Sequence, residues 1–305
     1  MSASVLPLRL WEAWVRRLTE PVDNRPFALL RITACLCVVV DLARLGSLGL
    51  VPHLFRLYAD GGLSRAADSG WVLGSLLGPA AGPVAYGVTL GAVTLMMLGI
   101  GGRPVAFLAV LAYAQLGHLY SPGDRAVDRA LRTVLLIQAA SPALHRLALG
   151  PLWRAAQAAV PTTMPAWPEW LVRWLLVLMY LSAGTAKLIE QPDWLATSGT
   201  PVLYRIVTDP MAGTVDPVAA AAWPWLWRIG GWLTIGLELA SPLLLTRFRH
   251  FWAVGGILMH LGIALTMDLG MFSWGMLSMY LVVLSPWVVR VLDRWGIGVR
   301  PPSSG

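Results

Sequence analysis

Long apolar runs alternate with short polar stretches along most of the chain. A helix that crosses the hydrocarbon core of a bilayer needs about 20 mostly apolar residues. The pattern therefore predicts an all-α fold, a polytopic integral membrane helical bundle with about eight transmembrane helices. These helices are expected at residues 27–45, 82–101, 104–121, 129–148, 168–189, 227–246, 250–268 and 271–291.

Two shorter apolar segments are expected to contact the membrane without crossing it. Residues 8–17 have the spacing of an amphipathic helix, in which Leu10, Trp11 and Trp14 lie opposite charged side chains. Such a helix rests at the interface between lipid and water. Residues 71–77 are too few to span a bilayer and indicate a re-entrant or interfacial piece.

The order of these segments predicts one membrane domain with short ends. We expect an interfacial amphipathic segment at residues 1–26, a transmembrane domain at 27–292 and a short cytoplasmic tail at 293–305. The longest stretch between two expected spans, residues 191–226, is predicted to lie on the outer side. We expect short helices there that cover a pocket.

The composition fits lipid as the surrounding solvent. Apolar residues make up 57% of the chain, charged residues make up 13%, and the mean hydropathy is +0.64. Soluble domains average about 45–50% apolar residues and about 25% charged residues. The net charge of +7 comes from cations scattered between apolar runs, which argues against a nucleic acid partner. Membrane lipids are the expected partners. Tryptophan, present 16 times, is typical of membrane boundaries.

The distribution of the cations predicts the orientation. With eight spans both termini share one side, and that side carries 13 of the 23 cationic residues. Because cytoplasmic loops are enriched in lysine and arginine, both termini are expected in the cytoplasm. No cleavable signal peptide is recognisable, so we expect a multi-pass protein of the cell inner (plasma) membrane whose first span is retained.

Ionisable side chains at membrane depth are candidates for function. A charge there costs at least about 2.5–3.5 kcal/mol on insertion scales. The residues of this kind are Arg31, Asp41, His118, Asp124, Asp128, Arg132, Lys187, Glu238, His260 and Asp268.

Local pairing offers a structural explanation for several of them. Arg31, near the start of the first span, is expected to snorkel to the interface or to pair with a carboxylate on another helix. Asp41 and Arg44 are spaced to pair along one helix.

The same holds at the start of the fourth span. Asp128 and Arg132 stand at i and i+4, the favourable order for a helical ion pair. Asp124 follows a Pro-Gly pair and is expected to cap this helix.

Lys187 differs from every other cation because the remaining 22 are arginines. Burial can lower the pKa of a lysine until it works as a neutral base or nucleophile, which an arginine cannot do. The four residues before it, 183–186, are small and would let another helix or a flat ligand approach closely. The alternative is a lysine that snorkels at a helix end and complements the helix dipole.

The remaining polar residues have simpler explanations. An isolated His260 in the seventh span is more often a hydrogen-bonded core residue than a ligand, and Glu238 lies mid-span in the sixth. Asp268 ends the seventh helix beside a tight turn. The spacing of a metal site is not recognisable, so no metal is predicted. Cys35 and Cys37, at i and i+2, cannot pair with each other.

Two blocks carry a resemblance to a known family. Residues 178–188, LMYLSAGTAKL, are followed by Asp193 and Trp194, and His260 is followed after nine residues by Gly-Met-Phe-Ser at 270–273. In this order the blocks resemble the vitamin K-dependent gamma-carboxylase-like family, whose bacterial members are called HTTM (horizontally transferred transmembrane) domain proteins. The similarity extends from about residue 20 to residue 292.

The resemblance implies a chemistry. In the carboxylase the lysine matching Lys187 deprotonates vitamin K hydroquinone, oxygen turns that anion into a stronger base, and carbon dioxide then adds to a peptide glutamate. Lys187 and His260 are therefore the expected catalytic residues, in an outward-facing pocket for a reduced quinone like vitamin K hydroquinone. Its expected cofactor-binding residues are Asp124, Glu238, His118, Trp194 and Phe272.

Departures from the carboxylase qualify this expectation. Gly123 and Asp124 stand where the carboxylase has an Asn-His pair, and Ala186 replaces a second lysine. The chain given ends at Gly305, without the large lumenal part that binds substrates. We therefore expect peptide carboxylation only if a partner supplies a secreted or periplasmic peptide or protein substrate.

Three functions follow from these observations. The first is a quinone-dependent membrane enzyme with carboxylase-like or other proton-abstraction chemistry and Lys187 as general base. The second is a non-catalytic or accessory protein for the maturation or assembly of secreted peptides or toxins. A transporter is disfavoured because two matching halves with broken helices are not recognisable.

Overall fold

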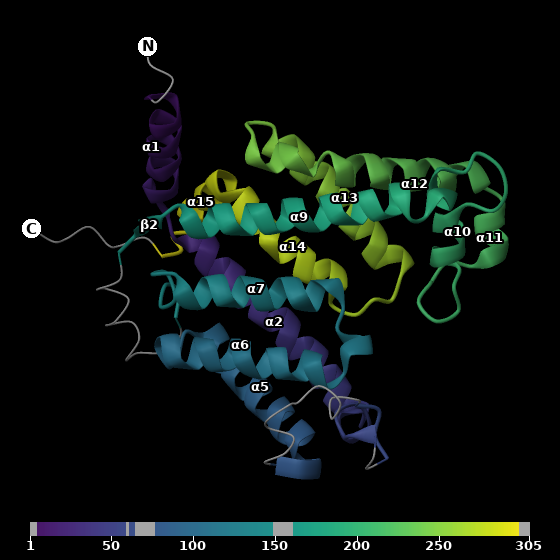
Figure 1. Ribbon diagram of the computed structural model, residues 1–305, viewed down its shortest axis with the longest axis horizontal. Coiled ribbons are helices and arrows are strands. Elements are labelled where there is room, and N and C mark those ends of the chain that lie inside the picture. The colour runs from purple at the N-terminus through teal and green to yellow at the C-terminus, as the bar shows by residue number, and fades with distance from the viewer. Residues whose placement is uncertain (1–4, 59–60, 65–76, 149–160, 299–305) are drawn as a thin grey trace, which may run out of the picture. The chain divides into compact units, whose positions relative to one another are not determined.

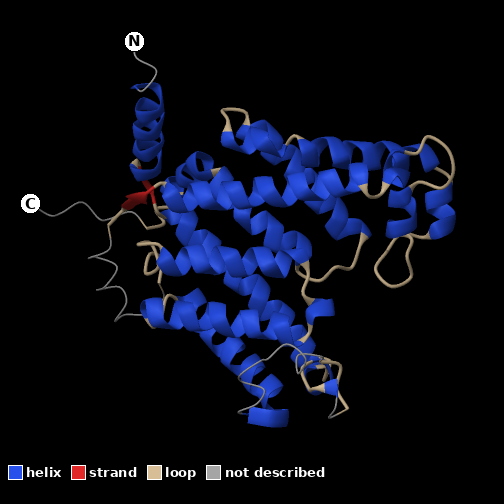
Figure 2. Ribbon diagram, in the orientation of Figure 1, coloured by secondary structure: helices blue, strands red, loops and turns tan. Residues whose placement is uncertain are grey.

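The computed structural model describes residues 5–58, 61–64, 77–148 and 161–298. The chain divides into two compact units, residues 1–170 with 285–305 and residues 171–284, which are described in turn. Helices make up most of the described chain, so the expected all-α class is confirmed (Figure 2). The amphipathic helix expected at 8–17 is present, whereas 71–76 of the expected short piece lie outside the described residues.

The first unit is built around helix α2, which contacts α5, α7 and α15 (Figure 1). Helix α6 packs against both α5 and α7. The longer helices of this unit are α1 (Val5–Thr19), α2 (Arg25–Ser47), α5 (Ala81–Leu98), α6 (Gly102–Leu119), α7 (Ala126–Ala140) and α15 (Ser285–Arg294). Its shorter elements are β1 (Pro21–Asp23), α3 (Val51–Leu54), η3 (Gly78–Ala80), η4 (Ser121–Gly123) and β2 (Thr163–Pro165).

The core of the first unit follows from the helical period. Phe27, Leu30, Ala34 and Val38 recur at three- and four-residue intervals along α2, and all four are almost completely buried. Strands β1 and β2 pair antiparallel, with Pro21 opposite Pro165.

The helix expected at 129–148 is shorter than predicted. Helix α7 ends at Ala140, and turns occupy 141–147. Such an end leaves backbone carbonyls without helical partners. Arg31, which is completely buried, donates a hydrogen bond to the carbonyl of Leu144 and another, 3.5 Å long, to that of Leu147. Both expectations for Arg31, snorkelling and pairing with a carboxylate, are therefore wrong.

The second unit contains the rest of α9 and three further long helices. Helix α13 contacts α12 and α14, and the short elements η5 and α10 contact α12. Its long helices are α9 (Trp167–Ile189, from Leu171 onward), α12 (Pro224–Leu239), α13 (Arg249–Thr266) and α14 (Phe272–Val283). Its short elements are η5 (Pro192–Leu195), α10 (Val202–Val207), α11 (Pro217–Ala221) and η6 (Ser241–Leu245).

Short helices therefore occur in the stretch 191–226 as expected, whereas its role as a cover stays a prediction. Thr214 fastens this stretch to the end of α13, because its backbone N–H donates to the carbonyl of Thr266 at 3.0 Å. The turn expected beside Asp268 is present at Gly270, whose φ is +59°. A positive φ strains any other residue type, which explains the glycine.

Two expected helices are interrupted near a proline. The helix expected at 227–246 ends at Leu239, and the one expected at 271–291 is broken at Leu284. Pro242 and Pro286 follow these two ends. Proline lacks the backbone N–H that would continue the helical hydrogen bonds, and its ring clashes with the preceding turn.

By length and composition, three described helices can cross a membrane, namely α2, α5 and α9. A fourth span results if α14 and α15, bent where they meet, are counted as one. A helix is present within each of the eight expected runs, but eight spans are not confirmed. Large apolar side chains stay exposed on several of these helices, as lipid contact requires. Examples are Leu111, Leu178, Leu233, Leu258 and Leu265.

Candidate functional site

One face of α9 carries the candidate residues of the second unit. Tyr180, Gly184 and Lys187 stand at i, i+4 and i+7, which places them on the same side of the helix. A Cβ at Gly184 would lie 2.9 Å from the Cβ of Glu238 and 3.2 Å from Leu239. The small residue thus lets α12 approach α9, as its position before Lys187 predicted.

Lys187 forms an ion pair with Glu238. The Lys187 Nζ donates to both carboxylate oxygens, at 2.7 Å and 2.9 Å. The two side chains are mostly buried, with 20% and 7% of their surface exposed. Nζ also lies 5.4 Å from the ring centroid of Trp194, within reach of a cation–π interaction. The structure therefore brings together three of the predicted site residues.

His260 belongs to a second cluster, and it is 1% exposed. Its Nε2 lies 2.6 Å from the hydroxyl of Tyr180, which lies 3.0 Å from the hydroxyl of Tyr280. The ring of Phe272, also a predicted site residue, has its centroid 5.8 Å from that of the imidazole. The Nδ1 atom of His260 has no hydrogen-bond partner among the described residues.

Three residues of this second cluster were missed by the sequence analysis. They are Tyr180, Tyr280 and Trp252, whose ring centroid lies 4.9 Å from that of Tyr180. Tyrosine and tryptophan in an apolar run are typical of a membrane boundary, so their presence did not indicate a site. The available signal was the seven-residue spacing between Tyr180 and Lys187 inside the recognised block.

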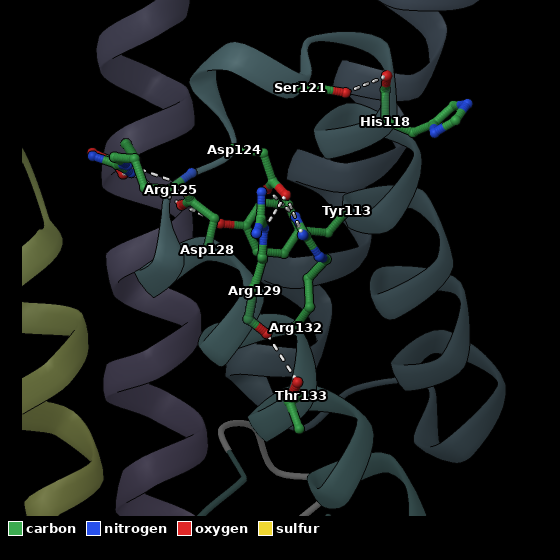
Figure 3. Close-up of polar contacts among 10 residues, drawn as sticks. Tyr113, His118, Ser121, Asp124, Arg125, Asp128, Arg129, Arg132 and Thr133 are labelled. Carbon is green, nitrogen blue, oxygen red and sulfur yellow. Dashed lines mark hydrogen bonds and ion pairs between the residues drawn. The ribbon is translucent and has the colours of Figure 1, made fainter. Parts of the chain in front are cut away.

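Asp124, in the first unit, binds two arginines of α7 (Figure 3). Its carboxylate accepts from Arg132 at 2.6 Å and 2.8 Å and from Arg129 at 3.0 Å. A Cβ at Gly117 would lie 2.5 Å from the Arg132 guanidinium, so a glycine at this position of α6 leaves the space that the pair occupies. Burial raises the pKa of Asp124, but the hydrogen bonds from Arg132 and Arg129 outweigh it and hold this pKa below its ordinary value.

The expected cap of α7 comes from a different aspartate. Asp128 accepts a 3.0 Å hydrogen bond from the backbone N–H of Arg125, the residue before the helix, and a 2.8 Å bond from the hydroxyl of Tyr113. The expected cap by Asp124 and the expected Asp128–Arg132 pair are therefore both wrong. Arg125 also forms ion pairs with Asp128 and with Asp41 of α2, a contact that local spacing did not predict.

His118 completes the predicted set. It lies at the end of α6 with an exposed side chain, and its backbone carbonyl accepts from Ser121 at 3.5 Å. Its imidazole points away from Asp124 and Arg132 (Figure 3). The predicted site residues therefore divide between the units, because Asp124 and His118 belong to the first and the others to the second.

Neither unit shows a metal centre in its described part. Within these residues, no group of three or more His, Cys, Asp or Glu side chains is placed to hold a metal ion. Cys35 and Cys37 are buried and not joined by a disulfide.

Long apolar helices with exposed leucines define the class, a mostly helical membrane protein. The chain belongs to the HTTM domain family, because the model of that domain matches residues 19–287, nearly its whole length. The resemblance carried by the two sequence blocks is thereby confirmed. No curated protein and no solved structure matches the chain.

Proposed function

We propose that this HTTM domain protein is a membrane enzyme that takes up a proton from a lipid-soluble, quinone-like ligand. The observation that carries the proposal is the buried pair of Lys187 and Glu238 beside the ring of Trp194. The proposed setting is a multi-pass protein of the inner membrane, with both termini in the cytoplasm and the pair near the outer side.

The pair is better suited to this work than a lone lysine. A carboxylate bound to an ammonium stabilises the charged form of each group, and two groups in contact bind and release protons as one unit. The proton of Lys187 first passes to Glu238, which becomes a carboxylic acid, and the neutral amine of Lys187 then takes up the proton of the ligand. The ammonium of Lys187 is then released from its partner and neutralises the negative charge left on the ligand.

The side chains around the pair fit an aromatic ligand that carries oxygen. Trp194 offers a flat ring beside Lys187, and Phe272 offers another beside His260. The buried Nδ1 of His260 lacks a partner within the described residues and can bind an oxygen atom. A reduced quinone would supply an acidic ring hydroxyl when bound. Trp194, Phe272 and His260 would orient it, and the Lys187–Glu238 pair would hold its proton.

Oxygen uptake tests the proposal, because oxygen reacts faster with a deprotonated hydroquinone than with the neutral form. The protein in lipid nanodiscs is given reduced 2-methyl-1,4-naphthoquinone, and the rate without protein is subtracted. Removal of a general base typically lowers a rate by about 10²–10⁴-fold. We expect that loss in Glu238→Gln, and in Lys187→Arg because arginine holds its proton too firmly to share it within the pair.

Arg205→Lys is the matched control. It exchanges the same two residue types in the same unit, at an exposed pair with Asp193. We expect an unchanged rate. A wild-type rate in Lys187→Arg would exclude Lys187 as part of the base. A wild-type protein that neither accelerates oxygen uptake nor retains a quinone, by mass spectrometry of its copurified lipids, would refute the proposal.

A second candidate is an accessory role in the maturation of a secreted peptide. One observation favours it: the same ion pair joins α9 to α12, and the Tyr180–His260 contact joins α9 to α13, as purely structural ties would. Lys187→Arg preserves an ion pair with Glu238. Peptide maturation that survives in this variant, in the absence of any oxygen uptake by the wild type, would favour the accessory role.

A further inference from the structure

The hydroxyls of Tyr280 and Tyr180 and the imidazole of His260 form one buried hydrogen-bonded chain. The distances are 3.0 Å between the two hydroxyls and 2.6 Å from Tyr180 to the Nε2 of His260. All three side chains are at least 96% buried, since the largest exposed fraction among them is 4%, at Tyr180. The chain ends at the Nδ1 of His260, which is unpartnered in the described part of the protein.

We infer that Tyr180 and Tyr280 are positioning residues that fix the proton of His260 on Nδ1, so that this atom donates to a neutral acceptor oxygen of a bound ligand. The identity of the ligand rests on the proposed function. The position of the proton does not, because it follows from contacts within the protein.

The chemistry of the phenol and the imidazole determines which group donates at each hydrogen bond of this buried series. A neutral imidazole has one N–H donor and one acceptor nitrogen, whereas a phenol hydroxyl both donates and accepts. The phenol is the more acidic donor, and the unprotonated imidazole nitrogen is the stronger base. Tyr180 therefore donates to Nε2 of His260, which leaves the proton of the ring on Nδ1.

The surrounding backbone is adapted to this chain. A Cβ at Gly256, one turn before His260 on α13, would overlap the hydroxyl of Tyr280. The glycine thus creates the space in which this hydroxyl reaches Tyr180. The ring of Trp252, one turn before Gly256 on the same helix, stacks on that of Tyr280, with 13° between the planes. Such fixed surroundings hold the donor in one orientation.

The ligand that fits this donor has a neutral acceptor oxygen on a flat apolar body. The Nδ1–H of His260 is buried, so an acceptor must bring little charge with it. The ring of Phe272 lies beside the imidazole and suits an aromatic body. A carbonyl oxygen on an aromatic ring has both properties.

Nitrogen-15 NMR of histidine-labelled protein in lipid tests the inference without any turnover. The protein has five histidines, and the signals of His260 are identified by their loss in His260→Gln. We expect a protonated Nδ1 and an unprotonated Nε2 in the wild type. In Tyr180→Phe we expect the proton to move to Nε2, the usual site in a neutral imidazole without a donor partner. In Tyr280→Phe it stays on Nδ1.

Tyr204→Phe is the control, because the hydroxyl of Tyr204 donates to the carbonyl of Pro217, within the stretch 191–226. It should leave the His260 signals unchanged. A wild-type Nε2–H form, or a Tyr180→Phe spectrum identical to that of the wild type, would overturn the inference. The wild-type spectrum decides the position of the proton even if a variant fails to fold.

The ligand is tested with oxidised 2-methyl-1,4-naphthoquinone as the probe. We expect it to shift the Nδ1 signal of the wild type and to bind Tyr180→Phe about two- to tenfold more weakly, the usual value of one hydrogen bond. An unmoved Nδ1 signal would refute this acceptor, and a bound water would then satisfy the donor. Lys187→Arg should keep the Nδ1–H form, so a failure of the proposed enzyme and a failure of this inference are distinguishable.

Discussion

The ion pair of Asp124 with Arg132 gives the sharpest test of the packing in the first unit. The change is Asp124→Asn, which keeps the shape of the side chain and removes its charge. Asp124 is 10% exposed and Arg132 16%, so the variant leaves a mostly buried guanidinium without its carboxylate. Loss of one partner costs about 3–5 kcal/mol in a fully buried pair, and an exposed pair contributes about 0–1 kcal/mol.

The Asp124–Arg132 pair lies between these limits. Arg129, which is 67% exposed, adds little to the pair because solvent screens its charge. We expect a destabilisation of about 2–3 kcal/mol, nearer the buried value because two short hydrogen bonds join Arg132 to Asp124. In a chain of this size that corresponds to a fall in the melting temperature of about 4–10 °C, measured by thermal denaturation in detergent.

The control is Asp193→Asn, because Asp193 pairs with Arg205 at 3.4 Å and both side chains are largely exposed. This variant should melt within about 2 °C of the wild type, as expected for an exposed pair. Equal melting temperatures for Asp124→Asn and Asp193→Asn would refute the reasoning, since burial would then not determine the value of the pair.

The pH dependence of the same pair has a definite sign. In the folded protein the pKa of Asp124 lies below its ordinary value, held there by the two guanidinium groups against the effect of burial. The pair therefore contributes its full stability above the unfolded pKa of about 3.9. That contribution is lost as the pH falls through the lower folded pKa. Below about pH 4 the melting temperatures of the wild type and Asp124→Asn should converge.

Three further predictions follow from contacts described above. Gly256→Ala should destabilise the protein by about 1–3 kcal/mol, because its methyl group overlaps the hydroxyl of Tyr280; an unchanged melting temperature would argue against that contact. Arg31→Leu should cost about 1–3 kcal/mol in the same assay, because the carbonyls of Leu144 and Leu147 lose their donor, whereas a snorkelling arginine would tolerate the change. The stretch 191–226 should be cleaved by protease added to intact spheroplasts, and protection there would reverse the proposed orientation.

The sequence predicted the helices well because the apolar runs are long and regular. It failed where one residue stops a helix, as at Pro242 and Pro286, since an apolar run can continue through a broken helix. It also failed in the choice of partners. Asp128 stands at the right spacing for Arg132, but Asp124 takes that arginine because η4 brings its carboxylate beside α7.

For the candidate site, residue types were predicted better than their contacts. Lys187 stood out as the only lysine, and Glu238 as a carboxylate at membrane depth. Their pairing depends on the close approach of α9 and α12 at Gly184, which no local pattern specifies. Tyr180 and Tyr280 were missed because the contacts of Tyr180 with His260 and with Tyr280 join residues 80 and 100 positions apart.

The buried contact of Arg31 has a consequence for the assembly of the protein. Its partner carbonyl at Leu144 is made 113 residues later, which corresponds to about 6–23 s of synthesis. During that interval α2 has a guanidinium at membrane depth with no acceptor, at a cost of about 2.5–3.5 kcal/mol. We expect this cost to be removed only when the turn after α7 emerges and its carbonyls accept from Arg31. The first unit would then assemble around a helix that is made early and gains this contact late.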